Sequence, residues 1–193
     1  MVEIKNVEVF NLERAQRAIE NSFNVGEINT TEGSVKDKLA RTLGSNMQSH
    51  QSHDAYLKGI LVTYDIKGNG VFMPEFQRYH FVNCKPLEEF DENNLQFTKY
   101  VSKDIKDIIL ELAKKYNDNK SQENYQRLIQ NLPRGIERWY RCTTNYLQLK
   151  TIVIQRFNHR NKEDWNDGFI KFCYSLPKFR ELCGFASSTW EIS

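Results

Sequence analysis

The stretch from residue 132 to residue 156, LPRGIERWYRCTTNYLQLKTIVIQR, constrains this chain more than any other part of it. The pattern predicts one long helix that follows Leu132 and Pro133. At about 100° per residue, one stripe of that helix places an amide and a guanidinium around two apolar side chains: Asn145, Leu149, Ile152 and Arg156. Because an unpaired guanidinium under a fold is costly, Arg156 requires an acidic side chain or an anionic ligand.

Composition sets the broad class. The 193 residues suffice for a substantial core, and no linker rich in Pro, Gly or Ser divides them, so we expect a single domain over 1–193. Lys plus Arg number 27 and Asp plus Glu number 25, a balance that argues against duplex DNA binding and membrane binding on global charge. The opening MVEIKNVEVF is not an apolar run and nothing later approaches a membrane-spanning length, so we expect a soluble cytoplasmic protein.

The cysteines form no paired motif. Cys84, Cys142, Cys173 and Cys183 lack CxxC spacing and fall in segments that resemble helices. We therefore expect reduced structural thiols, in preference to a disulfide framework or a zinc site.

Periodicity predicts a mixed α/β chain. An N-terminal strand at 2–9 has a probable break at Asn6, and a second strand at 60–66 ends in a Gly-containing turn. Helices are predicted at 11–23, 34–44, 71–81, 102–116, 121–131, 132–156 and 163–174.

Two blocks of sequence resemble the flavin-dependent thymidylate synthases. Leu132-Pro133, then Thr143-x-Asn145, then Arg156 resemble the C-terminal helix of that family. Upstream, His53, a strand and then Arg78-Tyr79-His80 resemble its His, its strand and its Arg-His-Arg signature. The resemblance covers most of the chain. It implies an α/β (α+β) fold with an antiparallel sheet and several long helices, in a homotetramer whose sites lie between subunits.

The resemblance also implies roles for residues. In that family FAD takes electrons from NADPH, and a methylene passes from methylenetetrahydrofolate to dUMP before its reduction to a methyl, so the cofactor carries the chemistry. Arg156 matches the position that contacts and polarises the pyrimidine, and it is the expected catalytic residue. The expected cofactor-binding residues are His53, Arg78, His80 and Asn145, with Arg78 on the flavin phosphate.

Each of these residues also has a structural interpretation. Arg156 could pair with a carboxylate at the edge of the core, and Asn145 could cap a helix. His80 could pack beside neighbouring aromatic residues, and His53 could lie exposed in a polar loop. The Arg78-Tyr79-His80 segment also differs from the family's Arg-His-Arg signature at its third position. A neutral imidazole at His80 lacks the permanent charge of the family's Arg.

The chain departs from the family just after His80. The family continues there with a Glu-x-Ser-x-Arg block that seats the dUMP phosphate, whereas this chain reads FVNCKPLEEFDENNLQF, with four carboxylates at Glu88, Glu89, Asp91 and Glu92. Arg134 and Arg138 are the best replacements, and we expect them to bind substrate together with Arg156. Both lie in the early turns of the long predicted helix, where the helix dipole is positive.

Three functions follow from these observations. The first is a divergent enzyme of this family that binds a uracil nucleotide. The second is a catalytically silent homologue that acts as an interaction or regulatory protein. The third and least favoured is a nucleic-acid-binding module that uses the basic and aromatic residues at 134–141, although such a run more often forms a solvated helix face. Lys150, Arg160 and Lys162 are interpreted as surface charge.

Overall fold

The fold is built on a five-stranded antiparallel sheet in the order β1-β2-β5-β3. The computed structural model describes residues 1–15, 52–87, 94–186 and 188–192. β4 pairs with the start of β5, on the edge that β3 also uses. The strands are β1 (Glu3–Phe10), β2 (Leu61–Asn69), β3 (Asn83–Pro86), β4 (Gln96–Phe97) and β5 (Ile136–Asn145).

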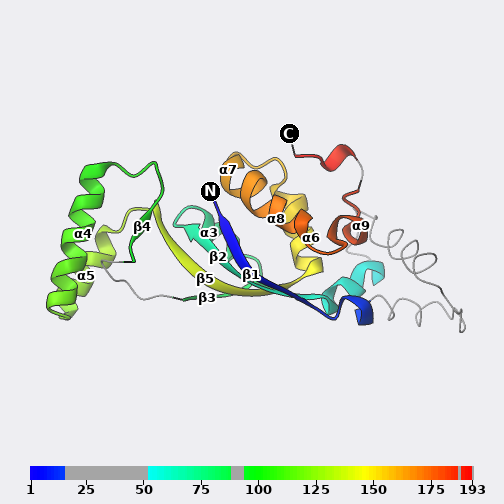
Figure 1. The fold of residues 1–193 in the computed structure, drawn as a ribbon, viewed down its shortest axis with the longest axis horizontal. Helices are drawn as coiled ribbons and strands as arrows, with labels where there is room; N and C mark the ends of the chain where they lie inside the picture. The colour runs from blue at the N-terminus through cyan, green and yellow to red at the C-terminus, as the bar shows by residue number, and fades with distance from the viewer. Residues whose placement is uncertain (16–51, 88–93, 187, 193) are drawn as a thin grey trace, which may run out of the picture.

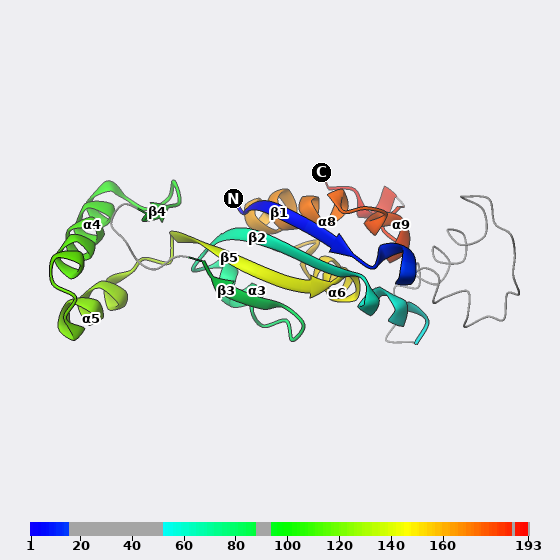
Figure 2. The same cartoon turned by 60° about the horizontal axis from the view of Figure 1, so that its bottom comes forward.

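Helices cover one face of this sheet. Figure 1 shows α6, α7, α8 and α9 on the same side of the strands, and Figure 2 shows the sheet between β1 and β3 from a second direction. The fold class that the sequence predicted is confirmed. The helical segments are η1 (Ser52–Gly59), α3 (Phe72–Phe76), α4 (Lys103–Asp118), α5 (Gln122–Asn131), α6 (Tyr146–Arg156), α7 (Lys162–Asp164), the π-helical η2 (Trp165–Ile170), α8 (Lys171–Ser175), α9 (Phe179–Cys183) and η3 (Ser188–Trp190).

Most predicted elements are present near their expected positions. Ser121 caps α5 by accepting a hydrogen bond from the backbone N–H of Asn124 at 3.2 Å. The break expected at Asn6 is confirmed, because this residue has a φ of 53° and the β1–β2 register shifts between Lys5 and Glu8. The predicted helix at 34–44, most of the helix from Asn11 and the acidic run after Leu87 lie outside the described residues.

The prediction of one helix over 132–156 is wrong in its first half. Residues 136–145 form β5, which pairs with β2 from Glu137 opposite Asn69 to Asn145 opposite Leu61. The segment is rich in Thr and aromatic residues, which suit a pleated surface, and its pairing with β2 decides the conformation. Helix α6 begins only at Tyr146, so Asn145 is its N-cap and not a residue of a continuous helical stripe.

The main core lies between the sheet and its covering helices. The side chains of β2 that face the helices, such as Val62 and Ile66, are fully buried. They belong to the same core as Leu149 and Ile152 of α6 and Phe169 of η2. Burying each such side chain is worth about 1.5–3 kcal/mol. Aromatic rings of α3 and η2 extend this core, since Phe72 lies 4.6 Å from Trp165 between ring centroids.

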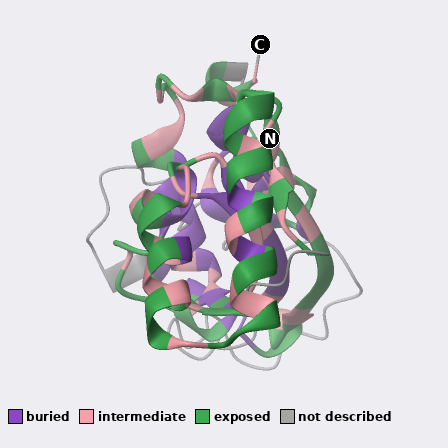
Figure 3. Ribbon diagram, turned by 90° about the vertical axis from the view of Figure 1, so that its left-hand side faces the viewer, coloured by how far each residue is buried: buried purple, intermediate pink, exposed green. Residues whose placement is uncertain are grey.

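Helices α4 and α5 form a separate pair at one end of the molecule. Ile109, Ala113 and Leu128 make a small buried cluster of their own between these helices. Figure 3 looks onto this end and shows how much of the pair is exposed. The single domain over 1–193 stays a prediction.

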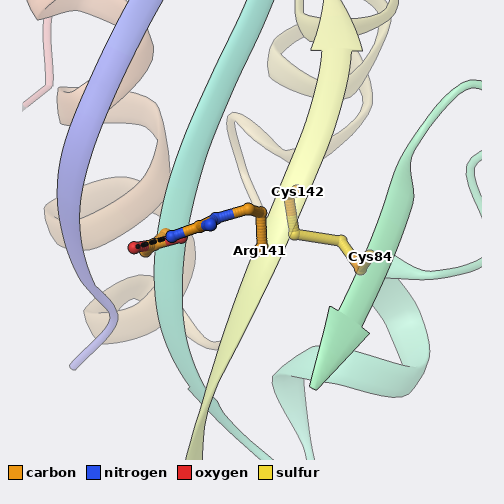
Figure 4. The surroundings of a disulfide bond; sticks show 4 residues. Cys84, Arg141 and Cys142 are labelled. Atoms are coloured by element: carbon orange, nitrogen blue, oxygen red, sulfur yellow. Dashed lines mark hydrogen bonds and ion pairs between the residues drawn. A yellow bond between two sulfur atoms is a disulfide. The ribbon is translucent and has the colours of Figure 1, made fainter. Parts of the chain in front are cut away.

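Two cysteines contradict the expectation of free thiols. Cys84 of β3 and Cys142 of β5 form a disulfide (Figure 4). The two residues are 58 positions apart in the sequence, but the β3–β5 register places them directly opposite each other. A search for CxxC spacing cannot detect this cross-strand pair. The prediction is confirmed for Cys173 and Cys183, which are free and buried, and burial raises the pKa of both thiols.

Lys150 was expected at the surface, and this is wrong. Its side chain is 3% exposed and its ammonium lies 3.2 Å from the Asp54 carboxylate, which is also buried. Helix α6 contacts η1, α9 and η2, so little of its circumference faces solvent.

The other face of the sheet carries an ion pair. Asp65 is 2% exposed and accepts hydrogen bonds from Arg141 Nε at 2.9 Å, Arg141 Nη2 at 3.1 Å and Asn6 Nδ2 at 2.7 Å. Figure 4 shows Arg141 extending from β5 toward this partner, on the side away from Cys84. The hydrogen bonds from Arg141 lower the pKa of Asp65 despite the opposing effect of its burial.

This shift gives a pH-dependent contribution to stability. Because the folded-state pKa of Asp65 lies below its unfolded value, the stabilisation is present above the unfolded pKa and is lost as pH falls through the folded pKa. We expect Asp65→Asn to reduce the loss of unfolding free energy between pH 6 and pH 3, relative to the same loss in the unmodified protein. Urea unfolding across this range measures it, with the exposed Asp167→Asn as the control. Identical pH profiles for Asp65→Asn and the unmodified protein would contradict the prediction.

Candidate functional site

Arg156 lies at the C-terminal end of α6 among polar and aromatic partners. Its Nε donates to the Tyr79 hydroxyl at 2.9 Å, and its Nη1 donates to Glu75 Oε2 at 3.1 Å. The guanidinium also stacks over the Trp165 ring, 4.6 Å from its centroid. The side chain is 18% exposed, so the group is half-buried and still reaches solvent.

One carboxylate oxygen holds this arrangement together. Besides the bond from Arg156, Glu75 Oε2 accepts from Trp165 Nε1 at 3.3 Å and lies 3.4 Å from His159 Nε2. His159 Nδ1 accepts a hydrogen bond from the backbone N–H of Asn161 at 3.2 Å, so Nε2 is the ring nitrogen that faces Glu75. We call these five residues the Glu75 cluster: Glu75, Tyr79, Arg156, His159 and Trp165.

Three parts of the chain build the Glu75 cluster. They are the segment from α3 to Tyr79, the C-terminal end of α6 with the residues up to His159, and the start of η2. Glu75 lies in α3, and Tyr79 lies in the turn that follows this helix; both contact the Arg156 guanidinium. Pro74 is tolerated because it occupies the first turn of α3. Trp165 begins the π-helical η2, and such turns are frequent at functional sites.

The partner that Arg156 requires is therefore an acidic side chain in this structure. The two partners lie 81 residues apart in the sequence. This contact matches the structural interpretation of Arg156, and it leaves further guanidinium N–H groups beyond the two that Tyr79 and Glu75 accept. Its catalytic role stays a prediction.

Asn145 serves as a helix cap. Its side-chain oxygen accepts a hydrogen bond from the backbone N–H of Gln148 at 2.9 Å, which satisfies one of the free N–H groups at the start of α6. This contact matches the capping interpretation. A flavin contact by the same side chain stays a prediction.

Arg78 and His80 flank the cluster at the surface. Both side chains are exposed, on either side of Tyr79 in the chain. Because Tyr79 bonds Arg156, the two sequence blocks that carry the family resemblance meet in space. His53 lies in η1, and its side chain is outside the described part of the structure.

Arg134 and Arg138 lie on a strand and its approach, which corrects the expectation that a helix dipole supports them. Arg134 is exposed and its carbonyl accepts from the N–H of Gly70 at 2.8 Å, while Arg138 pairs in register with Gly68. Arg138 and Asn145 are seven positions apart on β5, which is about 23 Å at about 3.3 Å per residue. These two predicted site residues of one chain therefore do not meet around one small ligand.

The basic and aromatic residues of β5 do not form the expected helix face. Successive side chains of a strand point to opposite faces, which divides the run. On the sheet face away from the helices, the Lys5 ammonium lies 3.9 Å from the centroid of the Trp139 ring, and Arg141 pairs with Asp65. Because Asp65 neutralises Arg141, this surface offers less positive charge to a nucleic acid than the sequence suggested.

A pocket of about 270 Å3 lies beside the start of the chain. Its lining includes Asn69, Glu163 and Asp164. Asp164 Oδ2 accepts from Asn69 and Asn161, and its other oxygen lies 3.4 Å from the Met1 ammonium. These contacts satisfy the buried carboxylate and anchor β1, which gives the pocket a structural role.

Neither a metal-ligand cluster nor a membrane-spanning helix is found among the described residues. In this part of the chain no group of three or more His, Cys, Asp or Glu side chains could hold a metal ion. No helix within it has the length and apolar character needed to cross a bilayer.

Comparison with known proteins identifies the fold. No family model matches the chain, and no curated protein matches its sequence. A crystal structure of thymidylate synthase X (ThyX) from Helicobacter pylori with FAD and dUMP matches with a TM-score of 0.65 over 94% of this chain and 95% of that chain. The fold resembles that of ThyX. A second ThyX structure from the same organism, also with FAD and dUMP, gives the same score over 96% of its chain.

The likeness to ThyX extends over nearly all of both chains, but sequence identity is 14%. At that level the comparison establishes the fold and leaves the activity open. Sequence reasoning missed four members of the Glu75 cluster as functional candidates. Glu75 and Tyr79 could have been noticed, because their spacing of four residues lies inside the predicted helix at 71–81. His159 and Trp165 carry no comparable signal.

Proposed function

We propose that this protein is a divergent ThyX-like enzyme that binds FAD and a uracil nucleotide and methylates dUMP or a related pyrimidine. The observation that carries the proposal is the 2.9 Å hydrogen bond from Arg156 to Tyr79. It joins the Arg78-Tyr79-His80 signature to the Arg156 position, inside a fold similar to enzymes solved with FAD and dUMP.

The residues fit such ligands in two respects. The exposed Arg78 guanidinium offers a charged, forked donor suited to a phosphate or pyrophosphate. Arg156 retains N–H groups that can donate to a pyrimidine carbonyl and favour charge on the ring. Arg134 is a second exposed cation, at the opposite end of β5 from Asn145. When bound, FAD would supply the redox chemistry, with NADPH as reductant and methylenetetrahydrofolate as the one-carbon donor.

Binding is tested first by absorbance. The purified protein should take up FAD, and dUMP should sharpen or shift the flavin spectrum if both ligands share a site. We expect Arg156→Ala to weaken dUMP binding by roughly tenfold to a hundredfold, because a hydrogen bond from a charged donor is lost. Arg127→Ala, on the exposed surface of α5, is the control and should leave binding unchanged.

A colourless protein that takes up no FAD, with or without dUMP, would contradict the proposal. Circular dichroism on Arg156→Ala shows whether the variant is folded, since the substitution also removes a partner of Glu75. Catalysis is tested separately, as oxidation of NADPH that depends on dUMP and methylenetetrahydrofolate.

We also propose a homo-oligomer, a tetramer by resemblance. Such an assembly would explain why the predicted residues of one chain are spread over both ends of β5, since each site would collect residues from several subunits. Analytical ultracentrifugation of the full chain tests this. A monomer at micromolar concentration would contradict it.

A catalytically silent homologue is the second candidate. It is favoured by the contacts that already occupy two predicted site residues, the Arg156–Glu75 ion pair and the Asn145 cap. This candidate predicts no FAD uptake and no NADPH oxidation, so the absorbance experiment separates it from the first.

A further inference from the structure

We propose that the disulfide between Cys84 and Cys142 is a reversible redox switch that docks or releases β3, and that its oxidation state sets how firmly Arg78 is held for a phosphate-bearing ligand. The part that concerns the ligand rests on the proposed function, in which Arg78 binds a phosphate or pyrophosphate. The part that concerns β3 does not depend on that function, so the two parts can fail separately.

The disulfide joins an edge strand to an interior strand of the sheet. β5 lies between β2 and β3, and β3 pairs with it through four residues, Asn83 to Pro86. Figure 4 shows the bond crossing from β5 to β3. The Cα atoms of Cys84 and Cys142 are 4.3 Å apart, a separation that suits a disulfide between directly opposed residues. The two thiols therefore meet again each time the strand pairing re-forms, which makes the bond reversible.

The other interactions of β3 are weak. Three of its four residues are exposed, namely Asn83, Lys85 and Pro86, so the strand buries little apolar surface. Pro86 also has no backbone N–H to donate to β5. A segment with so few buried contacts opens at a low cost in free energy once its covalent link is broken. Reduction of the disulfide is thus expected to release β3 while the rest of the sheet stays paired.

The two sulfur atoms differ in access. Cys142 is fully buried, whereas Cys84 lies on the edge strand and is partly exposed. A thiolate of a dithiol reductant therefore attacks Cys84 Sγ, the S–S bond breaks, and Cys142 leaves as a thiolate that takes up a proton. The second thiol of the reductant attacks the mixed disulfide, and Cys84 leaves as a thiolate that is protonated in turn. Two electrons and two protons pass to the protein, and the reductant ends as a disulfide.

The disulfide is one of two anchors of the segment 78–84. Near the start of this segment, the Tyr79 hydroxyl accepts a hydrogen bond from Arg156 at 2.9 Å. At its end, Cys84 is bonded to Cys142. Loss of the second anchor leaves the segment held mainly at its start, so its backbone can take up more conformations.

Arg78 depends on this segment for its position. Its side chain is exposed, so the direction of the guanidinium follows the backbone that carries it. A segment that is fixed at both ends loses less conformational freedom when a ligand binds, which raises the affinity. If about a tenth of the reduced molecules hold the binding geometry, the apparent affinity falls about tenfold. The oxidised protein is therefore the tighter binder of a phosphate-bearing ligand.

Hydrogen exchange tests the release of β3 without any ligand. The full chain is compared with its disulfide intact, after reduction by dithiothreitol, and after reoxidation by oxidised glutathione. We expect the backbone amides of 83–87 to exchange at least about tenfold faster after reduction, while those of β2 keep their rates. The amide of Leu87 is included, since it donates to the Trp139 carbonyl at 3.0 Å. Reoxidation should restore slow exchange, and Cys84→Ser should exchange fast without any reductant.

FAD titration, followed by absorbance, tests the consequence for Arg78. We expect FAD to bind roughly tenfold more weakly to the reduced protein and to Cys84→Ser than to the oxidised protein. Cys173→Ala removes a free thiol and keeps the disulfide, so this control should retain the difference between the two states. In Arg78→Ala the two states should bind FAD equally, because the group that the switch positions is absent. Circular dichroism checks that each variant is folded.

Each part of the inference has its own contradicting result. Equal exchange at 83–87 in the oxidised and reduced proteins overturns the switch, and so does faster exchange that reoxidation does not reverse. Faster exchange with unchanged FAD affinity overturns the link to Arg78, as does a redox effect on affinity that persists in Arg78→Ala. A protein that releases β3 on reduction but binds FAD in neither state contradicts the proposed function and supports the switch of β3.

Discussion

Lys150→Ala is expected to lower the free energy of unfolding by roughly 3–5 kcal/mol, because it leaves a buried carboxylate without its cation. Lys150 and Asp54 are 3% and 6% exposed at their side chains and lie 3.2 Å apart. Burial removes hydration from Asp54, and the nearby Lys150 ammonium offsets part of that cost. Urea unfolding at neutral pH, followed by circular dichroism, measures the change.

An exposed lysine gives the matched control. Lys171 contacts Asp167 at 3.0 Å across one helical turn, but its side chain is 58% exposed. Its substitution by Ala should cost about 0–1 kcal/mol, as is typical of solvated pairs. If Lys150→Ala lost as little stability as Lys171→Ala, the buried pair would not contribute as argued.

The paired variant Asp54→Leu with Lys150→Met provides a further check. Replacing both charges with apolar groups removes the cost of a buried carboxylate that has lost the Lys150 ammonium, so this protein should be more stable than Lys150→Ala. The comparison separates two effects on the free energy of unfolding: the cost of removing Lys150 from beside Asp54, and the net contribution of the ion pair.

Local sequence pattern predicted the elements whose stability is decided locally. Helices α4 and α5 have amphipathic faces and a Ser before each first turn, and both lie within two residues of their expected bounds. The strand was expected to end at Ile66 in a turn at 67–70, but β2 continues to Asn69 before α3 begins. These signals need no information from distant parts of the chain.

The failures share one cause, which is pairing between distant residues. β5 was predicted as a helix because its strand conformation is decided by pairing with β2, whose paired residues lie 68 (Asn69 with Glu137) to 84 (Leu61 with Asn145) positions upstream. The disulfide was missed for the same reason, since the register of β3 and β5 brings its cysteines together. Lys150 was assigned to the surface because its type is usually exposed, whereas the packing around α6 buries it beside Asp54.

The candidate site shows the same division. Sequence reasoning established that Arg156 needs an acidic partner or an anionic ligand, which follows from the cost of burying a guanidinium. It could not identify Glu75, because the contact depends on how α3 packs against the end of α6. The chemistry of a residue was thus predictable, while its partner depended on the fold.

The disulfide gives the second large prediction. A bond between Cys84 and Cys142 closes a loop across a sequence separation of 58 residues. On the chain-entropy model, a loop of this length stabilises the folded state by about 4 kcal/mol, with measured effects of typically 2–4 kcal/mol. We expect Cys84→Ser to lower the unfolding free energy by about 2–4 kcal/mol. Urea unfolding without reductant measures this change.

Reduction of the unmodified protein provides the matched test. With dithiothreitol its unfolding curve should move to that of Cys84→Ser, and the variant itself should not respond to the reductant. Alkylation under denaturing conditions should label two cysteines before reduction and four after it, because Cys173 and Cys183 are already free. The prediction is wrong if reduction exposes the two additional thiols and the unfolding curve does not move. That result would mean that β3, a four-residue edge strand, is held by its pairing with β5 alone.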